Sequence, residues 1–344
     1  MGDKIKEEKI KEFLNESSLT RLKLNDKVNV GCDNCGKCCY KIQTSLNAFD
    51  IYNISQVYDL KEILPKLDIS FGENSGLPIV GLQTDNLCTF SDEVDGDFKC
   101  SLGEYKPKAC MSPFLSIMTD TSELSFVPLD QEVTPLDPYE LIDKHSINNS
   151  EIVFLNDRFK SVCKCGNKKE ITVKEYLGDR YKYDKEYTIS AIIQILLCRY
   201  INPNEFFKII YLSDNSILSK DSSFPKDKSM YAIISSKISQ QTLFYAIEDT
   251  PIDRKDFLKT SIKQFNFLQN NLYPVMRKLY QMLIDVFYVD EKEMREIINM
   301  PDEISQQAFD LYFYKNRKEI SKRFQEEALK FMKDTANKNL KGVL

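Results

Sequence analysis

Residues 32–39 read CDNCGKCC, so four cysteines fall within eight positions of a polar, loop-forming segment. Two residues separate Cys32 from Cys35 and Cys35 from Cys38, and Cys39 follows directly. A gap of two residues lets neighbouring thiolates converge on one metal ion or one cluster. A hydrophobic core does not require thiols at such close spacing in a polar loop. The segment therefore predicts a metal site built from cysteine thiolates.

The cysteines are concentrated in one half of the chain. Nine of the ten lie between positions 32 and 165. The tenth, Cys198, lies in an apolar helical pattern, where we expect it to be inert. Residues 1–18 are charged and lack the apolar stretch of a secretory signal, so we expect a cytoplasmic protein. In that reducing compartment, cysteines at this density favour metal binding or redox chemistry over structural disulfides.

Turn residues surround the downstream cysteines, with Asp95 and Gly96 between Cys88 and Cys100 and with Pro107 before Cys110. Turns of this kind can bring distant thiols to the first cluster. A C-x-C pair at positions 163 and 165 supplies a further ligand, or a thiol pair that moves between metal and disulfide. The candidate ligands are Cys32, Cys35, Cys38, Cys39, Cys88, Cys100, Cys110 and Cys165, which is enough for two four-thiolate sites.

The nature of the ligands limits the cofactor. The triple C-x-x-C-x-x-C matches the way ferredoxin loops hold three irons of a [4Fe–4S] cluster, although the proline that follows in ferredoxins is absent. The single histidine, His145, lies in a polar stretch and is expected at the surface, which argues against a Cys/His zinc site. We expect an iron–sulfur cluster, with [4Fe–4S] favoured, and zinc is the alternative.

Composition leaves few other function classes. The 344 residues are 42% hydrophobic and carry a net charge of −5, which is typical of a globular protein and gives no reason to expect nucleic acid. No apolar run is long enough to predict a membrane span. Nucleotide-binding glycine motifs, a Walker loop and hydrolase motifs are all absent from the sequence. Metal ions are the expected partners, and the helical C-terminal region offers a possible surface for a protein partner.

Periodicity predicts an α+β fold, in which a small cysteine-rich domain with short strands and helices is followed by an all-α region. Apolar spacing predicts a helix over Leu46–Leu64 that ends at Pro65. Residues 77–82 and 124–129 favour strands, and the chain from 202 predicts a helix and then a linker to 228. Beyond residue 229, two apolar stripes predict long helices. The expected division is an N-terminal helix at 1–26, a metal-binding domain at 27–180 and a helical region at 181–344.

The apolar stripes of the helical region are defined by their spacing of three and four residues. The first stripe comprises Leu258, Ile262, Phe265, Leu268, Leu272, Val275, Leu279, Leu283 and Val286, with an interruption at Pro274. The second comprises Ala308, Leu311, Ile320, Phe324 and Leu329. Both stripes are expected to face neighbouring helices.

Three blocks of this sequence closely resemble the YkgJ-like cysteine cluster family, also called CxxCxxCC. They are GCDNCGKCCYKIQTSLNAFDIYNIS, LCTFSDEVDGDFKCSLGEYKPKACMSPF and CKCGNKKEITVKEYL. The resemblance covers roughly Lys27 to Leu177. The resemblance implies a zinc- or iron-chelating domain and the same eight ligands. The family usually has Arg-Pro before its third downstream cysteine and Arg after it, whereas this chain has Lys106-Pro107 and Met111.

Three hypotheses for function follow. The first is an iron–sulfur protein that carries electrons or assists the maturation of another protein. The second is a protein-modifying enzyme that resembles the flagellin lysine methylases, which also join an N-terminal cysteine cluster to helical structure. The third is a zinc-stabilised binding module whose metal contributes only folding free energy. The sequence leaves open whether the protein is an enzyme.

Overall fold

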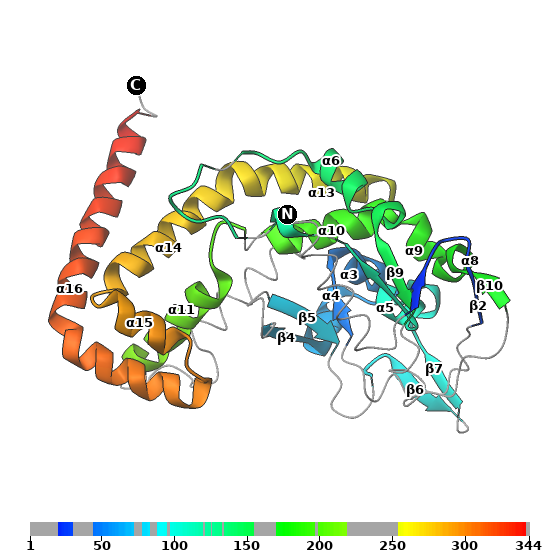
Figure 1. Cartoon of the computed structure of the whole chain (residues 1–344), viewed down its shortest axis with the longest axis horizontal. Helices are drawn as coiled ribbons and strands as arrows, with labels where there is room; N and C mark the ends of the chain where they lie inside the picture. Colours follow the sequence, from blue (N-terminus) through cyan, green and yellow to red (C-terminus); the bar gives the residue numbers. More distant parts are fainter. Residues whose placement is uncertain are drawn as a thin grey trace.

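The computed structural model describes most of the chain outside four long segments and several short gaps. The described residues are 20–29, 44–71, 78–82, 88–94, 97–119, 121–124, 126–132, 134–154, 170–196, 199–218 and 254–341. Small sheets and short helices make up one part of the molecule, and longer helices make up the other (Figure 1). The α+β class is therefore confirmed.

Four small antiparallel sheets are formed by the described residues. Each sheet joins strands that are short, and two of the four bring together segments more than 100 residues apart. The sheets, in spatial order, are β1 (Thr20–Leu22), β9 (Glu151–Phe154) and β8 (Leu115–Met118); β10 (Glu170–Thr172) and β2 (Lys27–Asn29); β3 (Ser45–Leu46), β5 (Pro78–Leu82) and β4 (Leu67–Phe71); and β6 (Ser91–Val94) and β7 (Asp97–Cys100).

Short helices lie between these strands. They are α3 (Ala48–Ile54), α4 (Leu60–Ile63), η1 (Leu64–Lys66), η2 (Gly103–Tyr105), α5 (Lys108–Met111), η3 (Ser122–Leu124), α6 (Pro138–Lys144), η4 (Ile147–Asn149), α8 (Val173–Leu177) and α9 (Asp179–Lys182). The longer helices are α10 (Asp184–Leu196), α11 (Pro203–Leu218), α13 (Arg254–Phe267), α14 (Tyr273–Phe287), α15 (Glu291–Ile298) and α16 (Asp302–Lys341). A π-helical segment, η5 (Leu268–Leu272), joins α13 to α14 in one path across the top of Figure 1.

Several sequence expectations need correction. The expected helix over Leu46–Leu64 is two helices, α3 and α4, because the turn between them is closed by side chains: Ser55 Oγ donates to the Tyr52 carbonyl oxygen at 2.6 Å. Residues 124–129 form no strand, since Leu124 ends the helix η3 and described residues 126–129 are irregular. The strand β1 also occupies the end of the expected N-terminal helix.

The two apolar stripes and the helix after residue 202 are the expectations for the helical region. The second apolar stripe is wrong in three of its five members, since Leu311, Phe324 and Leu329 are exposed. The buried face of α16 is instead formed by Phe309, Tyr312 and Ile320, which pack with α11, α14 and α15. The first stripe is mostly buried or half-buried, but Val275 is exposed. The helix expected after residue 202 is confirmed as α11, and residues 219–253 lie outside the described ranges.

An aromatic cluster packs the cysteine-rich part against the helices. Phe49 is fully buried, and its ring centroid lies 4.7 Å from that of Tyr187 on α10 and 4.8 Å from that of Phe257 on α13, both nearly edge-to-face. This arrangement is favourable beyond simple burial of area. Helix α3 therefore packs between strand β3 on one side and the helices α10 and α13 on the other. The division into units at residues 26 and 180 stays a prediction.

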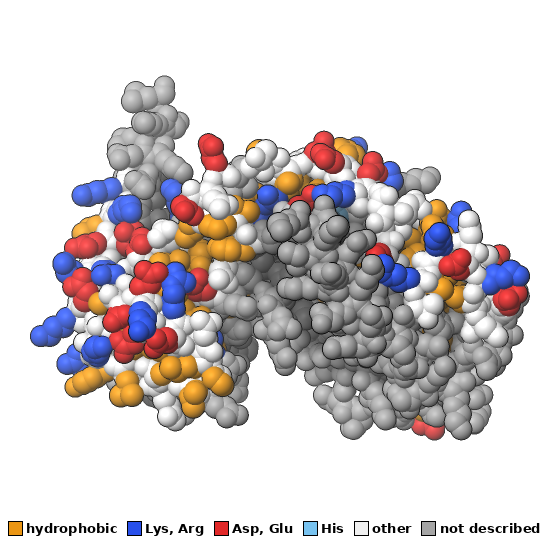
Figure 2. All heavy atoms as spheres, viewed as in Figure 1, with side chains coloured by type: hydrophobic (Ala, Val, Ile, Leu, Met, Phe, Trp, Pro, Cys, Tyr) orange, Lys and Arg blue, Asp and Glu red, His pale blue; other side chains and the backbone are white. Residues whose placement is uncertain are grey.

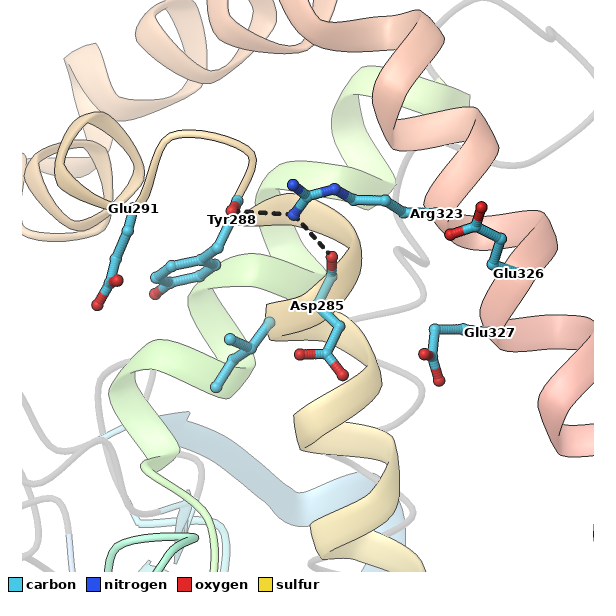
Figure 3. Close-up of a pocket in the computed structure, with 7 residues that line it drawn as sticks. Asp285, Tyr288, Glu291, Arg323, Glu326 and Glu327 are labelled. Atoms are coloured by element: carbon cyan, nitrogen blue, oxygen red, sulfur yellow. Dashed lines mark hydrogen bonds between the residues drawn. The ribbon is translucent and has the colours of Figure 1, made fainter.

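A pocket of about 450 Å³ lies where α14, α15 and α16 meet (Figure 3). Arg323 reaches from α16 and its Nη1 donates to the carbonyl oxygens of Asp285 and Tyr288, at 3.1 Å each. These carbonyls lie at the end of α14, where helix geometry leaves them without an internal partner. The remaining polar lining is acidic: Asp285, Glu291, Glu326 and Glu327. The arginine joins two helices here, so its role is structural.

Charges of both signs are interspersed over the helical part on the face shown in Figure 2. Lys315 with Glu293, and Arg295 with Glu291, are two of the ion pairs on its surface. Exposed pairs of this kind contribute little stability. Among the described helices, none has both the length and the apolar character needed to cross a bilayer.

One carboxylate is buried in the helical part. Glu205, on α11, is 6% exposed and accepts hydrogen bonds from the hydroxyl groups of Tyr280 and Tyr288. Arg295 Nη1 lies 3.4 Å from the same carboxylate and provides the opposite charge. A buried carboxylate with these partners is satisfied, whereas the loss of its donors would leave an expensive unpaired group. The network ties α11, α14 and α15 together.

The two tyrosines predict a loss of stability in alkali. Burial, and then the neighbouring Glu205, raise the phenol pKa of Tyr280 and Tyr288 above the ordinary value. The unfolded chain therefore releases these protons near pH 10 while the folded chain retains them, so their stabilisation is complete below about pH 10 and is lost as the pH rises. We expect the free energy of unfolding to fall more steeply above pH 10 in the wild type than in a Tyr280→Phe, Tyr288→Phe double variant. Equal slopes in denaturant titrations would contradict this.

Candidate metal centre

A β-hairpin brings two candidate ligands together. Strands β6 and β7 pair so that Ser91 lies opposite Cys100, and the Ser91 backbone N–H donates to the Cys88 carbonyl oxygen at 2.9 Å. The pairing extends past the strands, because the Ser101 N–H donates to the Phe90 carbonyl oxygen at 2.9 Å. Both cysteines are half-buried and pack against the hydrophobic core cluster that contains Phe49 and Phe90. The hairpin therefore presents two thiols from one edge of a packed core.

The third ligand candidate lies on a separate short helix. Cys110 is the third residue of α5, and this helix begins directly after Pro107. The Pro107 carbonyl oxygen accepts a hydrogen bond from the Cys110 N–H at 2.9 Å. The fixed φ of proline suits the first turn of such a helix. Thr44, a buried residue before β3, places its Oγ1 3.7 Å from the Cys110 sulfur. Cys110 is thus held by its own helix and contacted by an element 66 residues away.

Asp50 fixes the start of α5. One of its carboxylate oxygens accepts from the backbone N–H of Asn47 at 2.9 Å, which completes a capping box at the start of α3. The other accepts from the backbone N–H of Lys108 at 2.7 Å. Burial raises the pKa of the Asp50 carboxyl, and Lys108 with these N–H groups opposes that effect. A single buried side chain therefore holds two helix N-termini in register.

A second brace comes from α9. Arg180 Nη1 donates to Ser112 Oγ at 2.7 Å, and Ser112 Oγ donates to the Lys108 carbonyl oxygen at 3.2 Å. Ser112 is itself 1% exposed, so its hydroxyl is satisfied entirely within the protein. Both ends of the four-residue helix α5 are consequently attached to other elements. The position of Cys110 depends on Asp50 at one end and on Arg180 at the other.

The three thiols influence one another. Burial is the largest cause that raises the pKa of the Cys110 thiol to about 12; the hydrogen bond with Thr44 opposes this effect, and the charges of Cys88 and Cys100 add to it. A thiol in this environment remains protonated at neutral pH unless a cation compensates for the thiolate charge. The same three side chains would lose their protons on metal binding, because the thiolate is the ligand form.

Of the eight expected ligands, the structure describes Cys88, Cys100 and Cys110, which lie near enough for the charges of the first two to raise the pKa of the third. The other five candidates lie outside the described residues, together with the alternative ligand Cys163 and with Cys198; the five are Cys32, Cys35, Cys38, Cys39 and Cys165. Within the described ranges, no group of three Cys, His, Asp or Glu side chains is arranged to hold a metal ion. A complete site would therefore need donors from the segments around residues 32–39 or 163–165.

The expectation of a surface position for His145 is wrong. It ends α6 as its C-cap residue, is 6% exposed, and its Nε2 lies 2.6 Å from Glu123 Oε1. Burial raises the pKa of Glu123, but hydrogen bonds from Lys144 and His145 outweigh this effect and hold it below its ordinary value. Polar neighbours along the sequence suggested exposure, whereas Glu123 comes from a distant turn that sequence reasoning could not place.

Sequence reasoning also missed Asp50 and Asn47 as supports of the site. A signal was present, since Asn-x-x-Asp ahead of an apolar helix is the pattern of a capping box. The link from Asp50 to Lys108 is a contact across 58 residues and carries no such signal.

The comparisons with known proteins bear on the same segment. A family model, CxxCxxCC, described as "Putative zinc- or iron-chelating domain", matches residues 31–132. The match includes the four-cysteine loop, the hairpin with Cys88 and Cys100, and Cys110 on α5. Searches of curated proteins and of solved structures returned no match. Residues 31–132 of this chain are therefore similar to the CxxCxxCC family of zinc- or iron-chelating domains.

Proposed function

We propose that the protein binds an iron–sulfur cluster, with [4Fe–4S] favoured, through cysteine thiolates and uses it in electron transfer, in maturation of another protein or in a redox-linked modification. The observation that carries this proposal is the match of residues 31–132 to a zinc- or iron-chelating family model, because this segment contains seven of the eight candidate cysteines. The proposed ligand set also includes Cys32, Cys35, Cys38, Cys39 and Cys165.

The donor set supports this choice. An all-thiol set suits iron–sulfur clusters and tetrahedral zinc alike. The ferredoxin-type spacing of the loop and the excess of thiols over the four that one zinc ion needs favour the cluster. Three of the proposed thiols lie among the described residues, and the close spacing of the four cysteines at 32–39 favours a shared site for them. A bound cluster would contribute one-electron chemistry, while the chain positions the thiols and limits the access of water.

The proposal predicts a reversible optical change on reduction. Protein purified under anaerobic conditions should absorb in the visible region through sulfur-to-iron charge transfer, bleach on addition of dithionite, and recover on reoxidation. The bleaching should disappear in a Cys88→Ser, Cys100→Ser variant. A colourless protein that is indifferent to dithionite would overturn the proposal in favour of a zinc-stabilised module, whose metal contributes folding free energy only.

A further inference from the structure

A pocket of about 370 Å³ lies beside the proposed metal centre. Lys108 of α5, Arg180 of α9 and one face of α10 line it, with the turn after β8 opposite. This volume lies near the lower end of the range for small-molecule sites. Because Lys108 and Cys110 belong to the same four-residue helix, a molecule in this pocket would lie beside the helix that carries that cysteine.

Two basic side chains, Lys108 and Arg180, line the pocket; burial lowers the pKa of both, and a bound anion would favour their charged forms. Within the described ranges, neither Lys108 nor Arg180 forms an ion pair with a carboxylate, and one hydrogen bond from Arg180 goes to Ser112. Guanidinium has five N–H donors and ammonium three, so most of their donors are uncommitted. Arginine and lysine together are the side chains that recognise carboxylate and phosphate groups in proteins.

The carboxylates nearby are already engaged. Asp50 accepts from the N–H groups of Asn47 and Lys108. Asp184 accepts from the Ile147 N–H at 2.9 Å and from the hydroxyl of Thr188. These two negative charges reduce the cost of holding two cations away from bulk water. They do not occupy the donors that face the pocket, and so an anion can still be bound there.

Polarity changes along the pocket. Its α10 wall runs from Asp184 and Thr188 to Ala191 and Ile195, which lie on one helical face because they recur every three or four residues. The first pair is polar and the second apolar. With a rise of 1.5 Å per residue, this wall is about 16 Å long. A ligand matched to it would have a charged head at the α5 end and an apolar body along α10.

We propose that this pocket binds a small amphiphilic anion, whose carboxylate or phosphate group contacts Lys108 and Arg180 and whose apolar chain lies against α10. The site is separate from the thiols and is independent of which metal they hold. It offers a substrate or effector position next to the metal centre.

The test is calorimetric titration of the purified full-length protein with octanoate and with octyl phosphate, to distinguish the two anionic groups. Acetate supplies the head alone, and octanamide supplies the chain without the charge. We expect at least one of the two eight-carbon anions to bind tenfold or more tightly than both controls. Equal affinity for octanamide, or no heat with either anion, would overturn the proposal.

Two variants locate the site. Lys108→Met should weaken binding about tenfold, and Ala191→Phe should abolish it by filling the apolar end while leaving Lys108 in place. Lys185→Met removes an exposed lysine on α10 and is the matched control, with unchanged affinity expected. The melting temperature and metal content of each variant show that it is folded. Folded variants that bind both anions like the wild type would overturn the assignment to this pocket.

Discussion

Cys110→Ser is expected to abolish metal binding at the site that Cys110 shares and to lower the melting temperature by about 10 °C or more. The reason is that Cys110 is held in place by α5 and by Thr44, next to the thiols of Cys88 and Cys100. Loss of one thiolate leaves an incomplete ligand set. Because metal binding is coupled to folding in domains of this kind, the free energy of unfolding should fall with the metal.

Cys198→Ser is the matched control, since the sequence places Cys198 in an apolar helical pattern away from the other cysteines. Its metal content, measured by mass spectrometry of digested protein, should equal that of the wild type. A Cys110→Ser protein with full metal content and an unchanged melting temperature would show that Cys110 is not a ligand.

Asp50→Ala is expected to destabilise the protein by about 3 kcal/mol or more, because it removes the acceptor of two buried backbone N–H groups, each of which costs about 1–3 kcal/mol when unsatisfied. The same change releases the start of α5, and metal affinity should fall with it. Denaturant unfolding measures the first effect, and competition with a chelator measures the second.

A matched control for Asp50→Ala is Asp137→Ala, which removes the exposed N-cap of α6. That change should cost about 1 kcal/mol, as for an ordinary helix cap, and should leave metal affinity unaltered. If both variants bind metal equally well, Asp50 acts only as a helix cap and does not position the ligand on α5.

The sequence predicted the parts of the site that depend on local chemistry. Turn residues at Asp95-Gly96 and Pro107 indicated that Cys88, Cys100 and Cys110 could approach one another; in the structure, β6 and β7 pair on either side of residues 95–96, and α5 begins after Pro107. The apolar residues of α3 and α4 recur every three or four positions on both sides of the turn. This spacing therefore could not reveal the break between the two helices. Their hydrogen bonds, and not their hydrophobicity, end the first helix.

Long-range contacts account for what was missed. Leu311 and Phe324 of α16 fit a helical stripe, but both are exposed. Phe309 and Tyr312 form the buried face of the helix instead, because they pack with Phe287 of α14. His145 is buried by its pairing with a glutamate 22 residues away. Such partners come from tertiary packing, which the pattern of one segment does not contain.

The central claim is that cysteine thiolates of the segment that matches the CxxCxxCC family model hold an iron–sulfur cluster. Its most direct test is the measurement of iron, acid-labile sulfide and zinc per chain in protein purified without exposure to oxygen. A [4Fe–4S] cluster predicts roughly four irons and four sulfides for each cluster bound, with zinc well below one per chain. One or two zinc ions per chain, without sulfide, would contradict the claim.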